Sequence, residues 1–291
     1  MSPTSPVLPP IFARWMSLLA FFLALFVGQG NSLAVVSAGG VAIIGYNDFN
    51  GSITVVALQA LSAGEDIYFT NNGWSSSSGA FNGAADDQGA GNESLIKLST
   101  TGVVPKGTVI SSTITGSNFV WASSGVIPGT TNGTAEFSNL ILDPQSDQIY
   151  AFQAQANNPL LNPSNFIYAL HFGDVDNPVF ADASDTLSGD VPPGLSETAH
   201  TAFAQTNLGF HGDGDGNHSS WGLNMSSPQI SSLQLDTGHK EDWLAAIANS
   251  SNWSEGQPSI AKLSVAPEPT RTLLLAMGAA GLLLRRSRHS Y

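Results

Sequence analysis

The chain has 291 residues, no cysteine and a formal net charge of −13, with 9 Lys and Arg against 22 Asp and Glu. The lack of cysteine excludes disulfides, thiolate nucleophiles and cysteine metal sites, and the acidic balance argues against binding to nucleic-acid phosphates. A chain of this length can bury a sizeable core, and a β-sandwich of this size can be a single domain.

The first 34 residues have the features of a signal peptide. Arg14 precedes an apolar run from Trp15 to Val27, and a small-x-small tripeptide ends at Ala34. We therefore expect cleavage after Ala34, so that the mature chain begins at Val35. A cut after Ala38 and a permanent N-terminal anchor are the alternatives.

Short runs rich in β-branched and aromatic residues follow, separated by turn residues such as Asn71-Asn72-Gly73. The predicted strands of this half are Val41–Tyr46, Ile53–Leu61, Ile67–Thr70, Glu93–Ser99, Thr108–Thr115 and Phe119–Trp121. Ser75–Asn92 contains mainly Ser, Gly, Ala and Asp, with almost no apolar anchor. It is predicted to be a mobile surface loop.

The second half contains two strong aromatic strand patterns, Asp147–Gln153 and Phe166–Phe172. Weaker strand candidates are Thr134–Phe137, Leu140–Leu142 and Thr198–Leu208, the last of which could also be a helix. The acidic, proline-bearing stretch Asp174–Gly194 is predicted to be a loop.

One helix is predicted over Glu241–Asn249, because acidic residues in its first turn suit the helix dipole. Trp243, Leu244 and Ile247, together with Trp253, can form one buried stripe. The fold class we expect is therefore mainly β, an antiparallel β-sandwich with one short C-terminal helix.

The segment His211–His218 (HGDGDGNH) is the best candidate for a metal site. Asp213, Asp215 and Asn217 alternate with glycines and offer the oxygen ligands that Ca²⁺ prefers. The EF-hand glycine and glutamate are replaced by His218 and Asn224, so the segment is no EF-hand, and a looser calcium loop is the candidate, although a solvated turn is more common for such segments. The alternatives are a solvated turn and a softer ion bound by the flanking histidines.

Two further groups could carry chemistry. A carboxylate pair from the acidic stretch could act in glycoside hydrolysis, although such residues are more often a solvated loop: Asp174, Asp176, Asp182 and Asp185. Three tryptophans could form a sugar-stacking surface, although packing in the core is more common: Trp74, Trp121 and Trp221. His171 is expected to be half-buried at the end of its strand.

The C-terminal 25 residues combine a polar tripeptide, an apolar run and a basic end. Pro267-Glu268-Pro269 precedes Thr272–Leu284, and Arg285, Arg286 and Arg288 follow. As a helix, the apolar run would be roughly 20 Å long, shorter than the roughly 30 Å hydrocarbon core of a bilayer. We therefore expect transient membrane insertion, with the arginines on the cytoplasmic side.

This order of motifs resembles the PEP-CTERM sorting signal of exported bacterial proteins. The resemblance implies that Pro267, Glu268 and Pro269 are recognised by an exosortase-like membrane protease, which cuts near the tripeptide and hands the protein to the cell surface. The central stretches resemble a recurrent β-rich domain of exported bacterial proteins, for which the resemblance implies no activity: Ala42–Asn47, Val56–Trp74, Ser146–Gln153, Phe166–Phe172 and Asp242–Trp253.

The sequence thus predicts a signal peptide (1–34), a β-rich extracellular domain (35–266) and a sorting signal (267–291) with a transmembrane helix and basic tail. We expect a non-catalytic binding or scaffold protein of the extracellular polysaccharide matrix and of biofilms, with no nucleic-acid partner and with calcium as the candidate cofactor. The alternatives are a secreted polysaccharide hydrolase and a purely structural matrix subunit.

Overall fold

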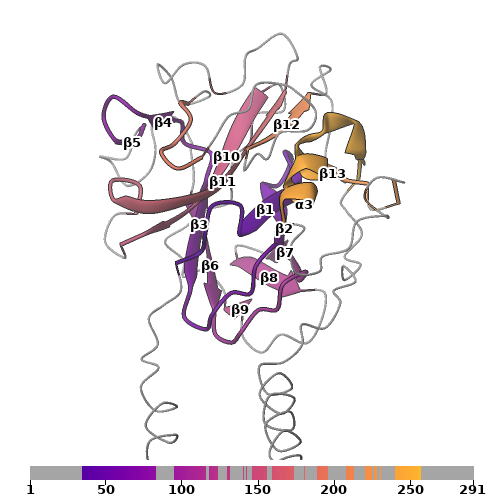
Figure 1. Ribbon diagram of the computed structural model, residues 1–291, viewed down its shortest axis with the longest axis horizontal. Coiled ribbons are helices and arrows are strands. Elements are labelled where there is room, and N and C mark those ends of the chain that lie inside the picture. Colours follow the sequence, from indigo (N-terminus) through magenta and orange to yellow (C-terminus); the bar gives the residue numbers. More distant parts are fainter. Residues whose placement is uncertain are drawn as a thin grey trace, which may run out of the picture. The chain divides into compact units, whose positions relative to one another are not determined.

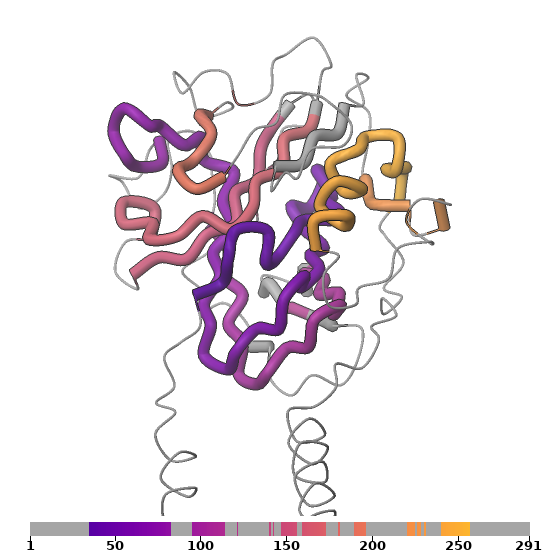
Figure 2. Tube along the Cα trace, viewed as in Figure 1, coloured from indigo at the N-terminus to yellow at the C-terminus, as the bar shows by residue number. Residues whose placement is uncertain are grey.

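The structure is a computed structural model of the full chain. It describes residues 35–82, 95–115, 118–123, 130–131, 140, 142, 146–155, 159–173, 180, 189–195, 208–212, 220–224, 226–227, 230 and 240–256, and the residues outside these ranges are grey in Figure 2. The chain divides into two compact units, Met1–Ala34 and Val35–Tyr291. Every described residue belongs to the second unit.

One six-stranded sheet has the strand order β14-β13-β1-β2-β7-β8, and all its neighbouring strands are antiparallel. Its strands are β1 (Val41–Asn47), β2 (Ser52–Ala57), β7 (Val109–Thr115), β8 (Asn118–Ser123), β13 (Trp221–Leu223) and β14 (Trp253–Glu255). Every side chain of β2 is buried, so both faces of this sheet are covered at its centre.

A second six-stranded sheet has the order β12-β11-β10-β3-β6-β9. Its strands are β3 (Asp66–Thr70), β6 (Leu95–Thr100), β9 (Thr130–Thr131), β10 (Ser146–Ala154), β11 (Pro163–Gly173) and β12 (Leu208–Gly212). β12 pairs with β11 in parallel, with Gly173 opposite Gly212, whereas the other pairs are antiparallel. Figure 1 shows β10, β11 and β12 running side by side.

The two sheets pack face to face over one apolar core, which we call the inter-sheet core. Tyr46 of β1 stacks on Phe172 of β11, and Phe69 of β3 meets Trp121 of β8, so aromatic pairs from both sheets interlock. The expected antiparallel β-sandwich is therefore confirmed, with the β11–β12 pair as a parallel exception.

The single described α-helix, α3 (Lys240–Ala248), matches the predicted helix to within one residue at each end. Trp243, Leu244 and Ile247 are buried in the inter-sheet core, as predicted. Trp253, just after the 3₁₀ turn η2 (Ser250–Asn252), donates its indole N–H to the carbonyl of Ile247 at 2.8 Å. The helix packs beside β12 and β1, and Figure 1 shows it next to β1.

The prediction of a loop over Ser75–Asn92 is wrong for its first part. β4 (Trp74–Ser75) and β5 (Ala80–Phe81) form a two-stranded sheet, in which Trp74 is opposite Phe81. Phe81 is only 2% exposed, because aromatic side chains of the second sheet surround it. Phe81 is therefore an apolar anchor that attaches this stretch to the sandwich.

Several predicted features lie outside the described residues. These are the signal peptide with Ala34, the candidate strand Thr134–Phe137, the four aspartates from Asp174 to Asp185, the calcium ligands Asp213, Asp215 and Asn217, and the sorting signal from Pro267 to Arg288. Within the described ranges, no helix is long and apolar enough to cross a membrane.

Candidate functional site

The three tryptophans proposed as a sugar-stacking surface do not form one. Trp74 and Trp121 are each 4% exposed and belong to different clusters of buried residues. Trp121 donates its indole N–H to the carbonyl of Lys97 at 2.8 Å, and Trp221 is half-buried against the inter-sheet core. Core packing, the alternative interpretation, is the correct one.

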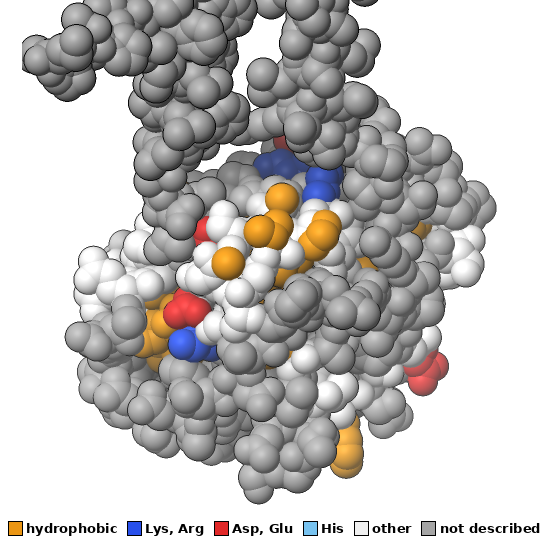
Figure 3. All heavy atoms as spheres, turned by 90° about the horizontal axis from the view of Figure 1, so that it is seen from below, with side chains coloured by type: hydrophobic (Ala, Val, Ile, Leu, Met, Phe, Trp, Pro, Cys, Tyr) orange, Lys and Arg blue, Asp and Glu red, His pale blue; other side chains and the backbone are white. Residues whose placement is uncertain are grey.

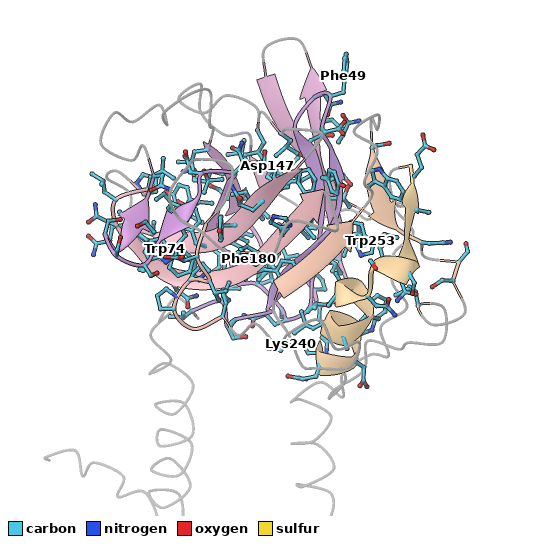
Figure 4. All side chains as sticks on the ribbon, turned by 90° about the horizontal axis from the view of Figure 1, so that it is seen from above. Phe49, Trp74, Asp147, Phe180, Lys240 and Trp253 are labelled. Carbon is cyan, nitrogen blue, oxygen red and sulfur yellow. The ribbon has the colours of Figure 1, made fainter. Side chains whose placement is uncertain are left out.

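Trp74 belongs to an aromatic cluster on the outer face of the second sheet. Along β10, Ile149 and Ala151 enter the inter-sheet core, whereas Tyr150 and Phe152 point to the opposite face, as the two-residue period of a strand requires. The aromatic cluster consists of Tyr68, Trp74, Phe81, Leu95, Tyr150, Phe152, Leu160, Phe166, Ala169, Phe180 and Leu195. Figure 4 labels two of its members, Trp74 and Phe180.

Residues 189–195, which we call the covering segment, close part of this cluster. A side chain at Gly189 would collide with the hydroxyl of Tyr150 and the backbone of Trp74, so the segment approaches as closely as its backbone allows. Asp190 donates its backbone N–H to the carbonyl of Trp74 at 2.7 Å, and its carboxylate accepts from the backbone N–H of Ser76 at 2.8 Å. Asp190 therefore fixes the β4–β5 hairpin rather than facing a substrate.

His171 also lies on this outer face, opposite Gln148 of β10. It is 2% exposed rather than half-buried as expected, because the ring of Phe180 packs edge-on against it at 5.7 Å. Burial lowers the pKa of His171 to about 4, so the imidazole is neutral at pH 7. Phe180 has a backbone φ of 51°, which is unusual for a bulky residue.

A buried polar group lies near the same end of the second sheet. Asp147 is fully buried, and its carboxylate accepts from the backbone N–H of Gln148 at 2.7 Å and from the Asn71 amide at 3.4 Å. Gln148 in turn donates to the carbonyl of Asn71 at 2.6 Å. These bonds link the start of β10 to the end of β3, so Asp147 has a structural role.

Gly173 and Gly212, the last residues of β11 and β12, are paired, and each directly precedes one of the two acidic stretches of the sequence. The chain leaves the sheet at these neighbouring positions, and the stretches beginning at Asp174 and Asp213 follow directly in the sequence. The candidate calcium ligands and the candidate hydrolytic carboxylates themselves lie beyond the described residues.

The first described residues form a second polar site, which sequence reasoning did not identify. Val36 is fully buried, and its backbone N–H donates to the side-chain oxygen of Gln153 at 3.1 Å. Its carbonyl accepts from the side-chain amide of Asn165 at 2.6 Å. Gln153 also donates to the carboxylate of Glu65 at 2.8 Å. We call Glu65, Gln153 and Asn165 the N-terminal clamp.

Other elements hold the residues that follow Val36. The hydroxyl and backbone N–H of Ser37 both donate to the side-chain oxygen of Gln59. The backbone N–H of Gly39 donates to the carbonyl of Ile167. The ammonium group of Lys240 donates to the carbonyl of Ala38 at 2.9 Å. Gly39 has a φ of +70°, and a side chain there would collide with Leu244. Residues 35–40, the N-terminal segment, thus join both sheets to α3.

Glu65 is the most unusual member of the clamp. It is 2% exposed, and its second carboxylate oxygen, Oε1, has no hydrogen-bond partner among the described residues. Burial raises the pKa of its carboxyl above the ordinary value, the bond from Gln153 opposes that shift, and the adjacent Asp66 adds to it. The hydrogen bond from Gln153 therefore offsets only part of the free-energy cost of burying a charged Glu65.

The clamp residues gave little signal in the sequence. Glu65, Gln153 and Asn165 belong to separate stretches, and tertiary pairing of β3, β10 and β11 brings them together. Gln153 and Asn165 are opposite each other across β10 and β11, which follows from register rather than from any motif.

Metal ligands do not gather in the described part of the chain, where no group of three or more His, Cys, Asp or Glu side chains could hold an ion.

On the face shown in Figure 3, the described side chains are mostly uncharged, and a basic and an acidic side chain lie side by side at its left. The ion pair between Lys97 and Asp66, 3.5 Å apart, is partly exposed and contributes at most about 1 kcal/mol.

Comparisons with protein-family models, with curated proteins and with solved structures gave no match.

Proposed function

We propose that this chain is an exported surface or matrix protein, whose β-sandwich is a non-catalytic binding or scaffold module. The agreement of two boundaries supports the export part of the proposal. The signal-peptide pattern predicts a cut after Ala34, and the compact unit that contains the sandwich begins at Val35.

The environment of Val36 supports this mature start over the alternative cut after Ala38. A cut after Ala38 would remove Val36, which is fully buried in the inter-sheet core and bonded through both backbone polar groups. Removing a buried valine and leaving Gln153 and Asn165 without these partners would cost several kcal/mol. A cut after Ala34 leaves all of these contacts in place.

The C-terminal segment is the proposed sorting signal. The last described strand, β14, ends at Glu255, before the Pro267-Glu268-Pro269 tripeptide. All five arginines lie in the two terminal segments that processing would remove: Arg14, Arg271, Arg285, Arg286 and Arg288. The proposed partner is an exosortase-like membrane protease, which would meet the tail during transient insertion of Thr272–Leu284.

A binding or scaffold role fits the chemistry of the described residues. The carboxylates of Asp66, Asp147 and Asp190 each accept a hydrogen bond from a residue distant in the sequence. Removing the arginine-bearing ends leaves a strongly acidic domain, which suits solubility and loose cation binding in a polysaccharide matrix. Calcium at Asp213, Asp215 and Asn217 would be one such cation.

The sorting proposal is tested by replacing Glu268 with Ala and following the protein in its native host. We expect the variant to keep its tail and to be retained at the membrane. Glu255→Ala is a matched control, because Glu255 is an exposed acid outside the tripeptide. Unchanged size and release of the Glu268 variant would contradict the proposal.

The molecular role is tested by incubating the processed protein with a glycan array and, in parallel, with matrix polysaccharide in a reducing-sugar assay. Glycan binding without sugar release is the expected result. Release of reducing sugar would contradict the non-catalytic role and favour the hydrolase alternative. A protein that neither binds nor cleaves would favour the purely structural matrix subunit.

A further inference from the structure

The N-terminal clamp holds a buried carboxylate that has no basic side chain as a partner among the described residues. Glu65 donates no proton when charged and has four lone-pair positions to satisfy, yet Gln153 alone bonds its side chain among the described residues. Buried carboxylates are normally paired or fully hydrogen-bonded, because leaving one unpaired is costly. Within the described part of the chain, Glu65 can therefore accept a further bond from a cationic or donor group.

The described charged groups around Glu65 do not supply a counter-charge. Asp66 is adjacent and acidic, and its own partners are Lys97 and Ser99. Lys240 reaches the N-terminal segment but donates to the carbonyl of Ala38. Tyr68, the other titratable group near Asp66, has its pKa raised by burial and is neutral at pH 7.

The Gln153 side chain links the N-terminal segment to this carboxylate. The backbone N–H of Val36 is bonded to Gln153, and the same Gln153 side chain is bonded to Glu65. The nitrogen of Val35 is one residue away along the chain, and Val35 is 68% exposed. Hydrolysis of the Ala34–Val35 bond would leave a carboxylate on Ala34 and an ammonium group on Val35.

We propose that Glu65 binds the α-ammonium group of Val35 that signal cleavage creates. The inference rests on the proposed export, and it assigns to the clamp a ligand, the new N-terminus of the same chain. Before cleavage, the nitrogen of Val35 is a neutral amide that offers one N–H. After cleavage it carries a positive charge and three donors, which matches the unsatisfied oxygen of Glu65.

Processing would then complete the fold. The N-terminal segment already contacts Gln59 next to the first sheet, β10 and β11 of the second sheet, and α3. An ion pair at Val35 would fix the end of this segment, so the processed protein would be more stable than its precursor. The ion pair between Val35 and Glu65 would thus link cleavage of the signal peptide to the stability of the folded domain.

The test uses the chain from Val35 to Tyr291 in mild detergent, prepared in three forms. The first has a free amine at Val35, the second is acetylated selectively at that amine, and the third retains Ala34 so that the charge is displaced by one residue. We expect the free-amine form to melt about 2–4 °C above the other two, the shift expected for an ordinary ion pair in a chain of this size. Equal midpoints for the three forms would overturn the proposal.

Two variants identify the partner of the amine. Glu65→Gln keeps an oxygen that can accept from Gln153 but removes the charge, and it should abolish the difference between the free and acetylated forms. Asp66→Asn, at the neighbouring and more exposed acid, should leave that difference intact. A difference that persists in Glu65→Gln would show that another group binds the terminus.

A second measurement does not depend on stability. The pH dependence of acylation at the α-amine gives its pKa, which is ordinarily about 7.7–8.0. We expect a value about one unit higher when Glu65 is present and an ordinary value in Glu65→Gln. Because these chains are made to begin at Val35, a negative result refutes only the proposed bond between Glu65 and the amine of Val35, and leaves the proposed export untouched. Mass analysis of the exported protein reports separately on the cleavage site.

Discussion

The ring of Tyr46 stacks on the ring of Phe172, with centroids 4.0 Å apart and an interplanar angle of 20°. Tyr46 belongs to β1 of the first sheet and Phe172 to β11 of the second, so this pair joins the two layers of the sandwich. Both rings are fully buried.

Tyr46→Ala and Phe172→Ala should each lower the free energy of unfolding by about 3–5 kcal/mol, because each removes a large ring from a filled core. The double variant should show a coupling of about 0.5–1.5 kcal/mol, typical of an aromatic pair. Urea denaturation of the processed chain measures both quantities. Phe49→Ala is the control, since Phe49 is 88% exposed at the tip of the β1–β2 hairpin and points away from the sandwich (Figure 4). Strict additivity would contradict a direct contact.

Phe81→Ala should lower the free energy of unfolding by about 3 kcal/mol or more. The reason is that the centroid of the Phe81 ring lies within 6 Å of the centroids of four other rings in the aromatic cluster. Hydrogen exchange should show selective opening of the β4–β5 hairpin and of the covering segment, which Asp190 ties to Trp74. If exchange there is as fast in the native protein as in the variant, the hairpin is a surface loop after all.

Stability should fall as the pH is lowered from about 6.5 to about 4, with His171 as one cause. The folded-state pKa is about 4 against 6.5 in the unfolded chain, so the unfolded state binds a proton first. The stabilisation is complete above pH 6.5, is lost as the pH falls toward 4, and amounts to something on the order of 3 kcal/mol. His171→Gln should remove this component of the pH dependence. A chemical-shift titration of His171 with an ordinary midpoint near 6.5 would refute the prediction.

Calcium should raise the melting midpoint of the processed chain if Asp213, Asp215 and Asn217 bind it. At a concentration about a hundredfold above the dissociation constant, the stabilisation would be about 2.7 kcal/mol. The double variant Asp213→Ala with Asp215→Ala should abolish the shift. A melting midpoint that rises with zinc instead of calcium would indicate a softer ion bound by His211 and His218. A midpoint that is the same in calcium and in EDTA leaves this segment as a solvated turn.

The sequence predicted the long central strands and the helix, because alternation and helical periodicity reflect which side chains are buried. It did not predict the short strands β4, β5, β9, β13 and β14, and it assigned His211 and Gly212, the end of β12, to the candidate calcium loop. It placed some ends wrongly where tertiary bonds decide them. The run Ile53–Leu61 was predicted as one strand, but β2 ends at Ala57 because the carbonyl of Gly40 accepts from the backbone N–H groups of Leu58 and Gln59. No local pattern encodes such a bond.

Isolated residues that act through distant partners were missed for a similar reason. Phe81 stands alone in a Ser/Gly-rich stretch, so no periodicity marks it as an anchor. His171 was expected to be half-buried, since nothing in its own strand indicates that Phe180 covers it. The N-terminal clamp depends on the register of β10 against β11, which sets Gln153 opposite Asn165.

The intact mass of the protein recovered from the surface or medium of its native host tests the central claim most directly. The account predicts a chain that begins at Val35 and that has lost the apolar run and the arginines after Pro267-Glu268-Pro269. A chain that still runs from Met1 to Tyr291, or that remains inside the cell, would contradict it.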